Sequence, residues 1–146
     1  MKRLILIILL TFILSFQPTS AETSKEYALM GSKAWSAFEC SVLASYGKKP
    51  KAEQERFFTL GYDAGITFLQ AFKEGKIIKE DLYNQLPIAF LLSLRGPNND
   101  FILGRVYEIV AEVAVKDIID IAKSDVELEK TLADDKFFKK NCHLIK

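Results

Sequence analysis

The chain has 146 residues, of which 49% are hydrophobic and 27% are charged, and its formal net charge is +1. This near-neutral balance excludes the strongly basic character that is typical of nucleic-acid-binding domains. The length suits one ordinary domain with a single hydrophobic core and leaves no room for a second. We therefore expect one domain and no nucleic-acid partner.

Residues 1–21 have the three-part layout of a secretory signal peptide. Two basic residues precede an apolar run at 4–16, and a short polar segment follows it. The run falls within the usual signal length of about 7 to 15 residues and below the roughly 18 that a membrane-spanning helix needs. Small residues predict cleavage after Ala21. Residues 22–146 would then be a periplasmic or secreted domain with no membrane span.

The two cysteines, Cys40 and Cys142, both belong to the predicted exported domain. An even cysteine count in an exported chain favours an internal disulfide, and two cysteines allow only one pairing. Such a bridge would tie the end of the chain to its first long helix. Two separate thiols or a bridge between two chains are the alternatives.

Apolar residues spaced three and four apart predict helices, and no stretch alternates as a half-buried strand would. We predict an all-α fold, a compact bundle of four to five helices. The first, at 24–46, carries apolar residues on two faces and should be central, ending at Gly47. The second, at 52–74, has Gly61 and Gly65 on its buried stripe. These glycines favour close helix packing over space for a ligand.

The third segment leaves its secondary structure open. Residues 79–85 indicate a short helix, and Pro87 then opens the apolar run 87–94. By length alone the run could be a buried strand. Its leucine and alanine content favours a short core helix that Pro87 starts or kinks.

The turn-forming cluster at 96–100 leads into the clearest amphipathic helix, at 101–123, which Asn99 or Asp100 should cap. Ser124 begins a Ser-x-x-Glu capping box and predicts that a new helix starts there. The acids at 134–135 could cap a further short helix, after which the tail would return to the first helix.

The residues offer no set that defines an enzyme. His143 is the single histidine, so neither a nucleophile with a base nor a four-ligand zinc site can be assembled. We predict no catalytic set, no metal site and no cofactor. A cell-wall hydrolase that uses acidic residues, with Glu39 as general acid, remains the enzymatic alternative, although the sequence selects no second carboxylate.

Two surfaces are candidates for recognition: a polar turn with the helix that follows it, and two phenylalanines near the end of the chain, both expected to be exposed. The residues are Pro97, Asn98, Asn99, Asp100, Arg105, Phe137 and Phe138. Turn formation and helix capping are the alternative role of the first group, and core packing is that of the aromatic pair.

In outline, as a small exported helical chain with one disulfide, the sequence resembles several groups of bacterial periplasmic proteins. They include immunity proteins against secreted cell-wall enzymes and small acid-protective chaperones. The likeness is of architecture, and no motif carries residues across. It implies an inhibitor, immunity or accessory protein that binds another exported protein. A stress chaperone that exposes apolar faces in acid is the other alternative, and the oligomeric state is open.

Overall fold

Residues 22–146 are described by a computed structural model, and within them the chain forms helices and short connections without a strand. The elements are α2 (Ser24–Tyr46), α3 (Lys51–Lys73), α4 (Lys79–Gln85), α5 (Ile88–Leu92), α6 (Asn99–Ala122), α7 (Val126–Lys139) and a 3-10 turn, η1 (Cys142–Leu144). The predicted all-α class is confirmed. This part has six α-helices rather than four to five, because Pro87 separates α4 from α5. The predicted signal peptide at 1–21 lies outside the described residues.

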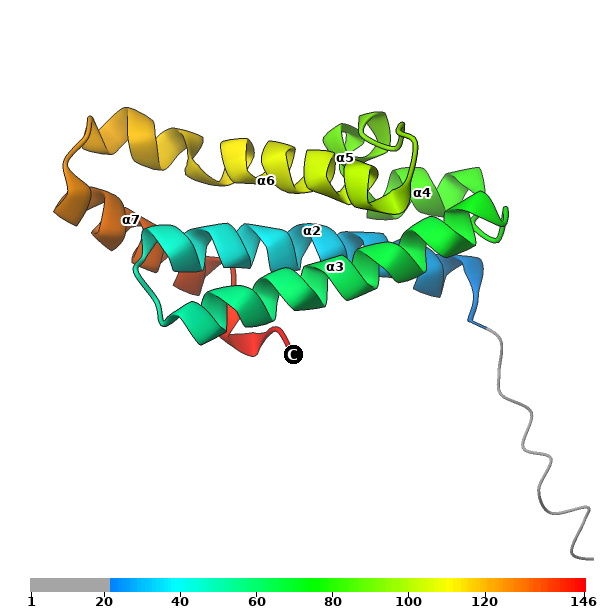
Figure 1. Ribbon diagram of the computed structural model, residues 1–146, viewed down its shortest axis with the longest axis horizontal. Coiled ribbons are helices and arrows are strands. Elements are labelled where there is room, and N and C mark those ends of the chain that lie inside the picture. Colours follow the sequence, from blue (N-terminus) through cyan, green and yellow to red (C-terminus); the bar gives the residue numbers. More distant parts are fainter. Residues whose placement is uncertain (1–21) are drawn as a thin grey trace, which may run out of the picture.

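The long helix α2 is central and contacts α3, α4, α6, α7 and η1 (Figure 1). Its antiparallel neighbour α3 lies along one side, and α6 and α7 form a second hairpin that covers the other. The short helices α4 and α5 sit at the end where α2 begins (Figure 1). Between residues 22 and 146, no helix is both long enough and apolar enough to span a membrane.

Phenylalanine rings of α2 and α3 pack against glycines of the facing helix. A Cβ added to Gly31 on α2 would lie 3.0 Å from Cδ2 of Phe68, and one added to Gly61 on α3 would lie 2.6 Å from Cδ1 of Phe38. Each helix therefore has a glycine where a phenylalanine ring of the other helix packs. Gly65 meets a leucine of α6 in the same way. The prediction that these glycines serve close packing is confirmed.

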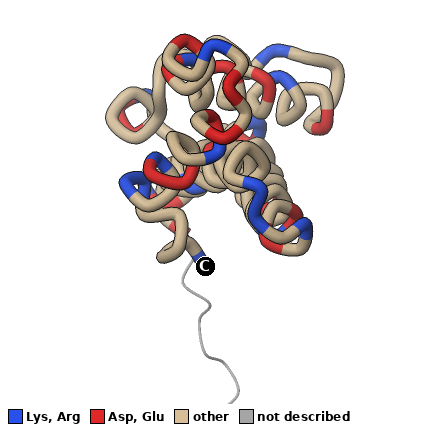
Figure 2. Tube along the Cα trace, turned by 90° about the vertical axis from the view of Figure 1, so that its left-hand side faces the viewer, with Lys and Arg blue, Asp and Glu red and all other residues tan. Residues whose placement is uncertain are grey.

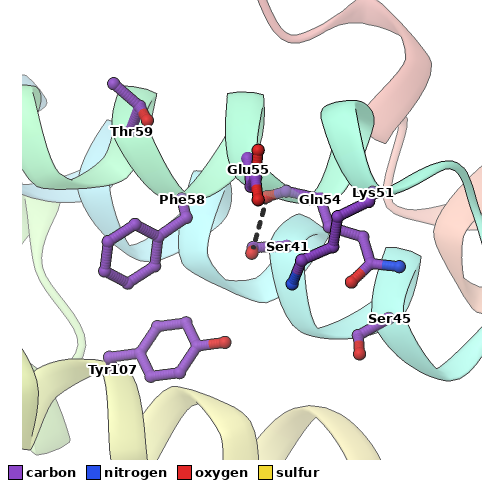
Figure 3. Close-up of a pocket in the computed structure, with 8 residues that line it drawn as sticks. All are labelled: Ser41, Ser45, Lys51, Gln54, Glu55, Phe58, Thr59 and Tyr107. Atoms are coloured by element: carbon purple, nitrogen blue, oxygen red, sulfur yellow. Dashed lines mark hydrogen bonds between the residues drawn. The ribbon is translucent and has the colours of Figure 1, made fainter.

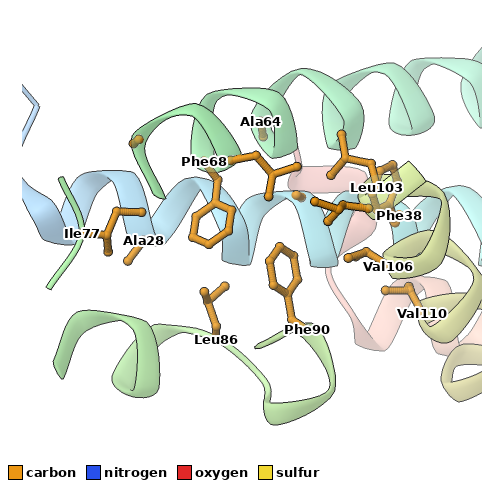
Figure 4. Close-up of a cluster of buried hydrophobic side chains, with 14 residues drawn as sticks. Ala28, Phe38, Ala64, Phe68, Ile77, Leu86, Phe90, Leu103, Val106 and Val110 are labelled. Atoms are coloured by element: carbon orange, nitrogen blue, oxygen red, sulfur yellow. The ribbon is translucent and has the colours of Figure 1, made fainter. Parts of the chain in front are cut away.

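The two interlocking rings also hold the other helices. Phe38 packs edge-on against Tyr107 of α6 at 5.3 Å between centroids, and Phe68 packs edge-on against Phe90 of α5 at 5.2 Å. The same cluster includes Leu86 between α4 and α5 (Figure 4). Edge-to-face pairs at this spacing contribute beyond their burial. The largest core cluster thus fixes the positions of α5 and α6.

The predicted cap of the amphipathic helix is wrong by one residue. Asn98, rather than Asn99 or Asp100, is the N-cap, and its side chain accepts a hydrogen bond from the backbone N–H of Phe101 at 2.8 Å. Asn98 has the extended backbone that an N-cap requires, whereas the two following residues are already helical.

The start of α7 also differs from the predicted capping box. Asp125, not Ser124, is the N-cap and accepts from the backbone N–H groups of Glu127 and Leu128 at 3.1 Å. Ser124 has a φ of 76°, since the chain turns through the left-handed region before α7 begins. A separate last helix capped at 134–135 does not form, because α7 continues through both aspartates.

Cys40 and Cys142 are paired at disulfide-bonding distance, with their Cα atoms 5.5 Å apart and a sequence separation of 102. Both side chains are buried in a second core cluster with Phe57 of α3 and Phe137 of α7. The predicted pairing is supported, and the C-terminal tail returns to α2 as expected.

Replacing both cysteines with serine is expected to lower the free energy of unfolding by about 2 to 5 kcal/mol, because the long loop is no longer closed in the unfolded chain. Guanidinium denaturation of the double variant measures the loss. Wild-type protein under reductant should reach the same stability. A double variant as stable as the oxidised protein would contradict the assignment.

Gly61→Ala is expected to destabilise the fold by about 1 to 3 kcal/mol through overpacking, although alanine favours helices. The new methyl group would meet the buried ring of Phe38. Gly104→Ala on α6 is the matched control, since nothing lies within 4 Å of its added Cβ. It should stabilise the protein by up to about 1 kcal/mol. Thermal unfolding measures the stability of both variants. A Gly61→Ala variant more stable than wild type would refute the close contact between Gly61 and Phe38.

Candidate functional site

The polar turn that sequence analysis singled out is held by bonds within the chain. Asn98 caps α6, Asn99 Oδ1 accepts from Lys73 Nζ at 2.5 Å, and Asp100 Oδ1 accepts from the hydroxyl of Tyr62 at 2.6 Å. The hydrogen bond to Asp100 raises the pKa of Tyr62. Pro97 itself is exposed. The turn therefore fastens α6 to α3, which is the alternative role considered for it.

Arg105 points back toward the segment before this turn. Its Nη1 donates to the backbone carbonyl of Arg95 at 2.9 Å. The guanidinium thus fixes the position of Arg95 on the far side of the turn.

Only one of the two phenylalanines that were expected to be exposed is exposed. Phe137 is only 2% exposed and packs edge-on against Phe57 beside the disulfide, whereas Phe138 is 57% exposed. The expectation is wrong for Phe137, because successive residues of a helix lie about 100° apart and α7 buries one face. The helix that carries Phe138, α7, lies in the half of the molecule away from the short helices α4 and α5 (Figure 1). The seven candidate residues therefore do not form one surface.

A cleft of about 440 Å³ opens between α3 and α6, with α2 as its floor (Figure 3). The rings of Phe58 on α3 and Tyr107 on α6 meet edge-on at 5.3 Å and close one end. The remaining lining is mostly polar: Ser41, Ser45, Lys51, Gln54, Glu55 and Thr59.

The buried serine of this cleft, Ser41, is not arranged for nucleophilic catalysis. The hydroxyl of Ser41 donates to the backbone carbonyl of Gln54 at 3.0 Å, and Gln54 Nε2 donates to the carbonyl of Lys49 at 2.8 Å. The first contact joins α2 to the start of α3, and the second joins α3 to the connection that precedes it. A serine nucleophile needs its hydroxyl bonded to a base, and here the acceptor is a carbonyl. The cleft can hold polar groups, but its inner side chains serve the α2–α3 hairpin.

The most exposed apolar side chains lie on α4 and α5. Ile88 is 72% exposed, Leu92 68% and Tyr83 65%, more than any other large hydrophobic residue of the described part. Ile88 and Leu92 stand four residues apart and therefore share one face of α5. These three residues are called the α4–α5 surface below. The sequence could not separate them from the core, because buried Phe90 lies within the same apolar run.

The backbone of α4 is hydrogen-bonded to α2, and α5 is held by the buried ring of Phe90. Leu86 and Phe90 are buried, and the hydroxyl of Ser32 donates to the carbonyl of Gln85. Ser24 binds the first turn of α4, donating to Asp81 and accepting from the N–H of Ile78, the N-cap, at 2.9 Å. The exposed apolar side chains thus project from a fixed platform.

A socket of about 380 Å³ adjoins Tyr83. Four half-buried apolar side chains from α3, α4 and the α5 region line it. Tyr83 and two cationic residues complete the lining. The residues are Phe72, Leu82, Leu91 and Leu94 with Tyr83, Lys79 and Arg95. Arg95 is the residue whose carbonyl Arg105 holds.

Glu39, the candidate general acid, is covered by the tail. It is 8% exposed, and its Oε1 lies 2.9 Å from Nζ of Lys140. It lines neither the cleft nor the socket. A general acid must reach the glycosidic oxygen of a bound substrate, so this position offers Glu39 no access to one.

Carboxylate ion pairs attach α7 to the rest of the fold, at the end where Figure 2 shows acidic and basic residues interspersed. Asp117 on α6 accepts from Lys136 at 2.6 Å, and this bond lowers the pKa of Asp117 despite some desolvation. Burial raises the pKa of Asp134, but hydrogen bonds from Lys49 and Lys130 outweigh it and lower the pKa overall. Acid therefore weakens the docking of α7.

Asp117→Asn is expected to lower the free energy of unfolding at pH 7 by no more than about 1 kcal/mol, the usual worth of a partly exposed pair. A depressed folded-state pKa gives stability that is present above the unfolded value near 4 and is lost as the pH falls through the folded value. The difference from wild type should vanish below that range. Urea denaturation across pH 2 to 7 tests this. Asp120→Asn, whose lysine partner is on the same helix, should cost less.

Within residues 22–146, no group of three or more His, Cys, Asp or Glu residues is placed to hold a metal ion. Comparisons of sequence and fold with family models, curated proteins and solved structures give no match. Function must therefore be argued from the surfaces themselves.

Proposed function

We propose that this chain is an exported binding protein that grips another exported protein through the α4–α5 surface and so inhibits or escorts it. The exposure of Tyr83, Ile88 and Leu92 carries the proposal. Clustered apolar side chains in water mark interaction sites on folded proteins, and Ile88 and Leu92 share one face of α5. A few residues near the centre of an interface supply most of its binding energy.

The rigid support of the α4–α5 surface favours binding over a merely incidental exposure. Leu86 and Phe90 anchor the two short helices in the core, and Ser24 and Ser32 bind the backbone at the two ends of α4. A surface that is already ordered loses little conformational entropy when a partner docks. Inhibitors and escorts benefit from this, because the binding energy is not consumed in ordering loops.

A chaperone released by acid is the second candidate, favoured by the carboxylate pairs that attach α7. Neutralising Asp117 and Asp134 would loosen α7 and uncover Phe57 and Phe137. The disulfide would still keep the tail near α2. Apolar dye binding that rises below about pH 4 would favour this role, because aspartates titrate there.

Ile88→Ser with Leu92→Ser is expected to abolish partner capture without loss of stability, since both side chains are mostly exposed. The tagged full-length chain is crosslinked in the native envelope, and the captured protein is identified, purified and titrated. We expect affinity to fall by roughly a hundredfold or more, as for central interface residues.

Val113→Ser with Ile121→Ser on α6 is the matched control, because these residues are also exposed and apolar. This double variant should bind as wild type does. Equal affinity of the α5 variant and wild type, or failure of the wild type to capture any partner, would overturn the proposal.

A further inference from the structure

We propose that the socket beside Tyr83 receives one large apolar side chain of the partner protein, and that Lys79 and Arg95 select a partner segment in which acidic residues flank that side chain. The inference rests on the proposed function and adds the chemistry of the partner.

The socket has the composition of a receptor for a single apolar group. Phe72, Leu82, Leu91 and Leu94 are all half-buried, so each presents apolar surface that is not covered by the protein's own core. A cavity of about 380 Å³ accepts one large side chain together with part of its backbone. Interface anchors characteristically fill such pockets.

The charged residues that line the socket have one sign. Lys79 and Arg95 line it, no acidic residue does, and neither cation forms an ion pair with another residue in 22–146. By contrast, Lys76 nearby is paired with Glu74 at 2.6 Å. Two cations left without counter-charges beside an apolar socket complement carboxylates carried by the occupant.

Arg105 keeps one of these cations in place. Its hydrogen bond to the carbonyl of Arg95 crosses the turn at 96–100, which is itself tied to α3 by Asn99 and Asp100. The turn and Arg105, predicted from the sequence to contact a partner, here position the cationic rim of the socket. Arg105 is a positioning residue in this arrangement.

An acidic segment of a protein fits these features better than a free carboxylate does. The socket lies beside Tyr83, whose side chain is part of the α4–α5 surface, so an occupant continuous with a docked protein would fill both. A small carboxylate would leave Ile88 and Leu92 in water. A second copy of the chain would have to bring carboxylates to this same cationic rim.

Three blocked pentapeptides test the chemistry by amide chemical shifts of the isotope-labelled full-length chain. The first has a central leucine between two aspartates, the second has lysines in place of the aspartates, and the third has alanine in place of the leucine. Trp35, the single tryptophan, packs against Phe90 of α5 and provides a second signal by fluorescence. We expect the first peptide to shift resonances of residues 72–95 and to bind roughly tenfold or more tightly than the others.

Lys79→Glu with Arg95→Glu should abolish binding of the aspartate peptide and transfer preference to the lysine peptide. The control, Lys33→Glu with Lys48→Glu, makes the same change in net charge at exposed lysines that have no ion pair in the described residues. It should leave the preference intact. Arg105→Lys should retain binding better than Arg105→Ala.

Several outcomes would overturn the inference: equal binding of the aspartate and lysine peptides, octanoate binding as tightly as the aspartate peptide, or a dimer in sedimentation whose formation Lys79→Glu abolishes. Binding measurements with the captured partner distinguish a failure of this inference from a failure of the proposed function. If the partner binds the Lys79 and Arg95 variant as tightly as wild type but still requires Ile88 and Leu92, only the selection by charge is wrong.

Discussion

The reciprocal contact between glycines and phenylalanines of α2 and α3 is the constraint on which the rest of the structure depends. Gly31 and Gly61 let the two helices approach closely enough for each to receive the other's ring. The same rings also pack against aromatic side chains of α5 and α6. A larger residue at either glycine would move a ring and, through it, a helix that carries the candidate surfaces. Packing this dense transmits such displacements, because protein interiors have few voids to absorb them.

The two ends of the molecule are held by different forces. At the start of α2, buried apolar side chains hold α4 and α5, and the hydroxyl of Ser32 binds a backbone carbonyl of α4; only the hydrogen bond from Ser24 to Asp81 involves a carboxylate. At the other end, aspartate–lysine pairs and the disulfide attach α7 and the tail. Acid can therefore loosen the α7 end while the α4–α5 platform keeps its shape. A binding role and an acid response could thus occupy separate parts of one fold.

The α4–α5 platform combines two features that bear on the proposed partner. Apolar side chains are exposed to water, and the two exposed cations that line the apolar socket form no ion pair within residues 22–146. The same chain buries Phe90 and Leu86 from the same short segment, so its apolar character is not a general lack of packing. Placement of such groups on a fixed surface is the physical basis for inferring a partner that is apolar and acidic at once.

The sequence by itself determined the helical class and the bounds of α2 and α3 to within a residue, and it favoured the close packing at Gly61 and the pairing of Cys40 with Cys142 over their alternatives. Each depends on a local pattern or on a choice with one solution. Only the tertiary structure decided that Phe137 is buried while Phe138 is exposed, that the turn at 96–100 fastens helices together, and that Ile88 and Leu92 face water. Apolar residues in a short helix look alike along the chain, because a helix of five residues is too short for its periodicity to show which face another helix will cover.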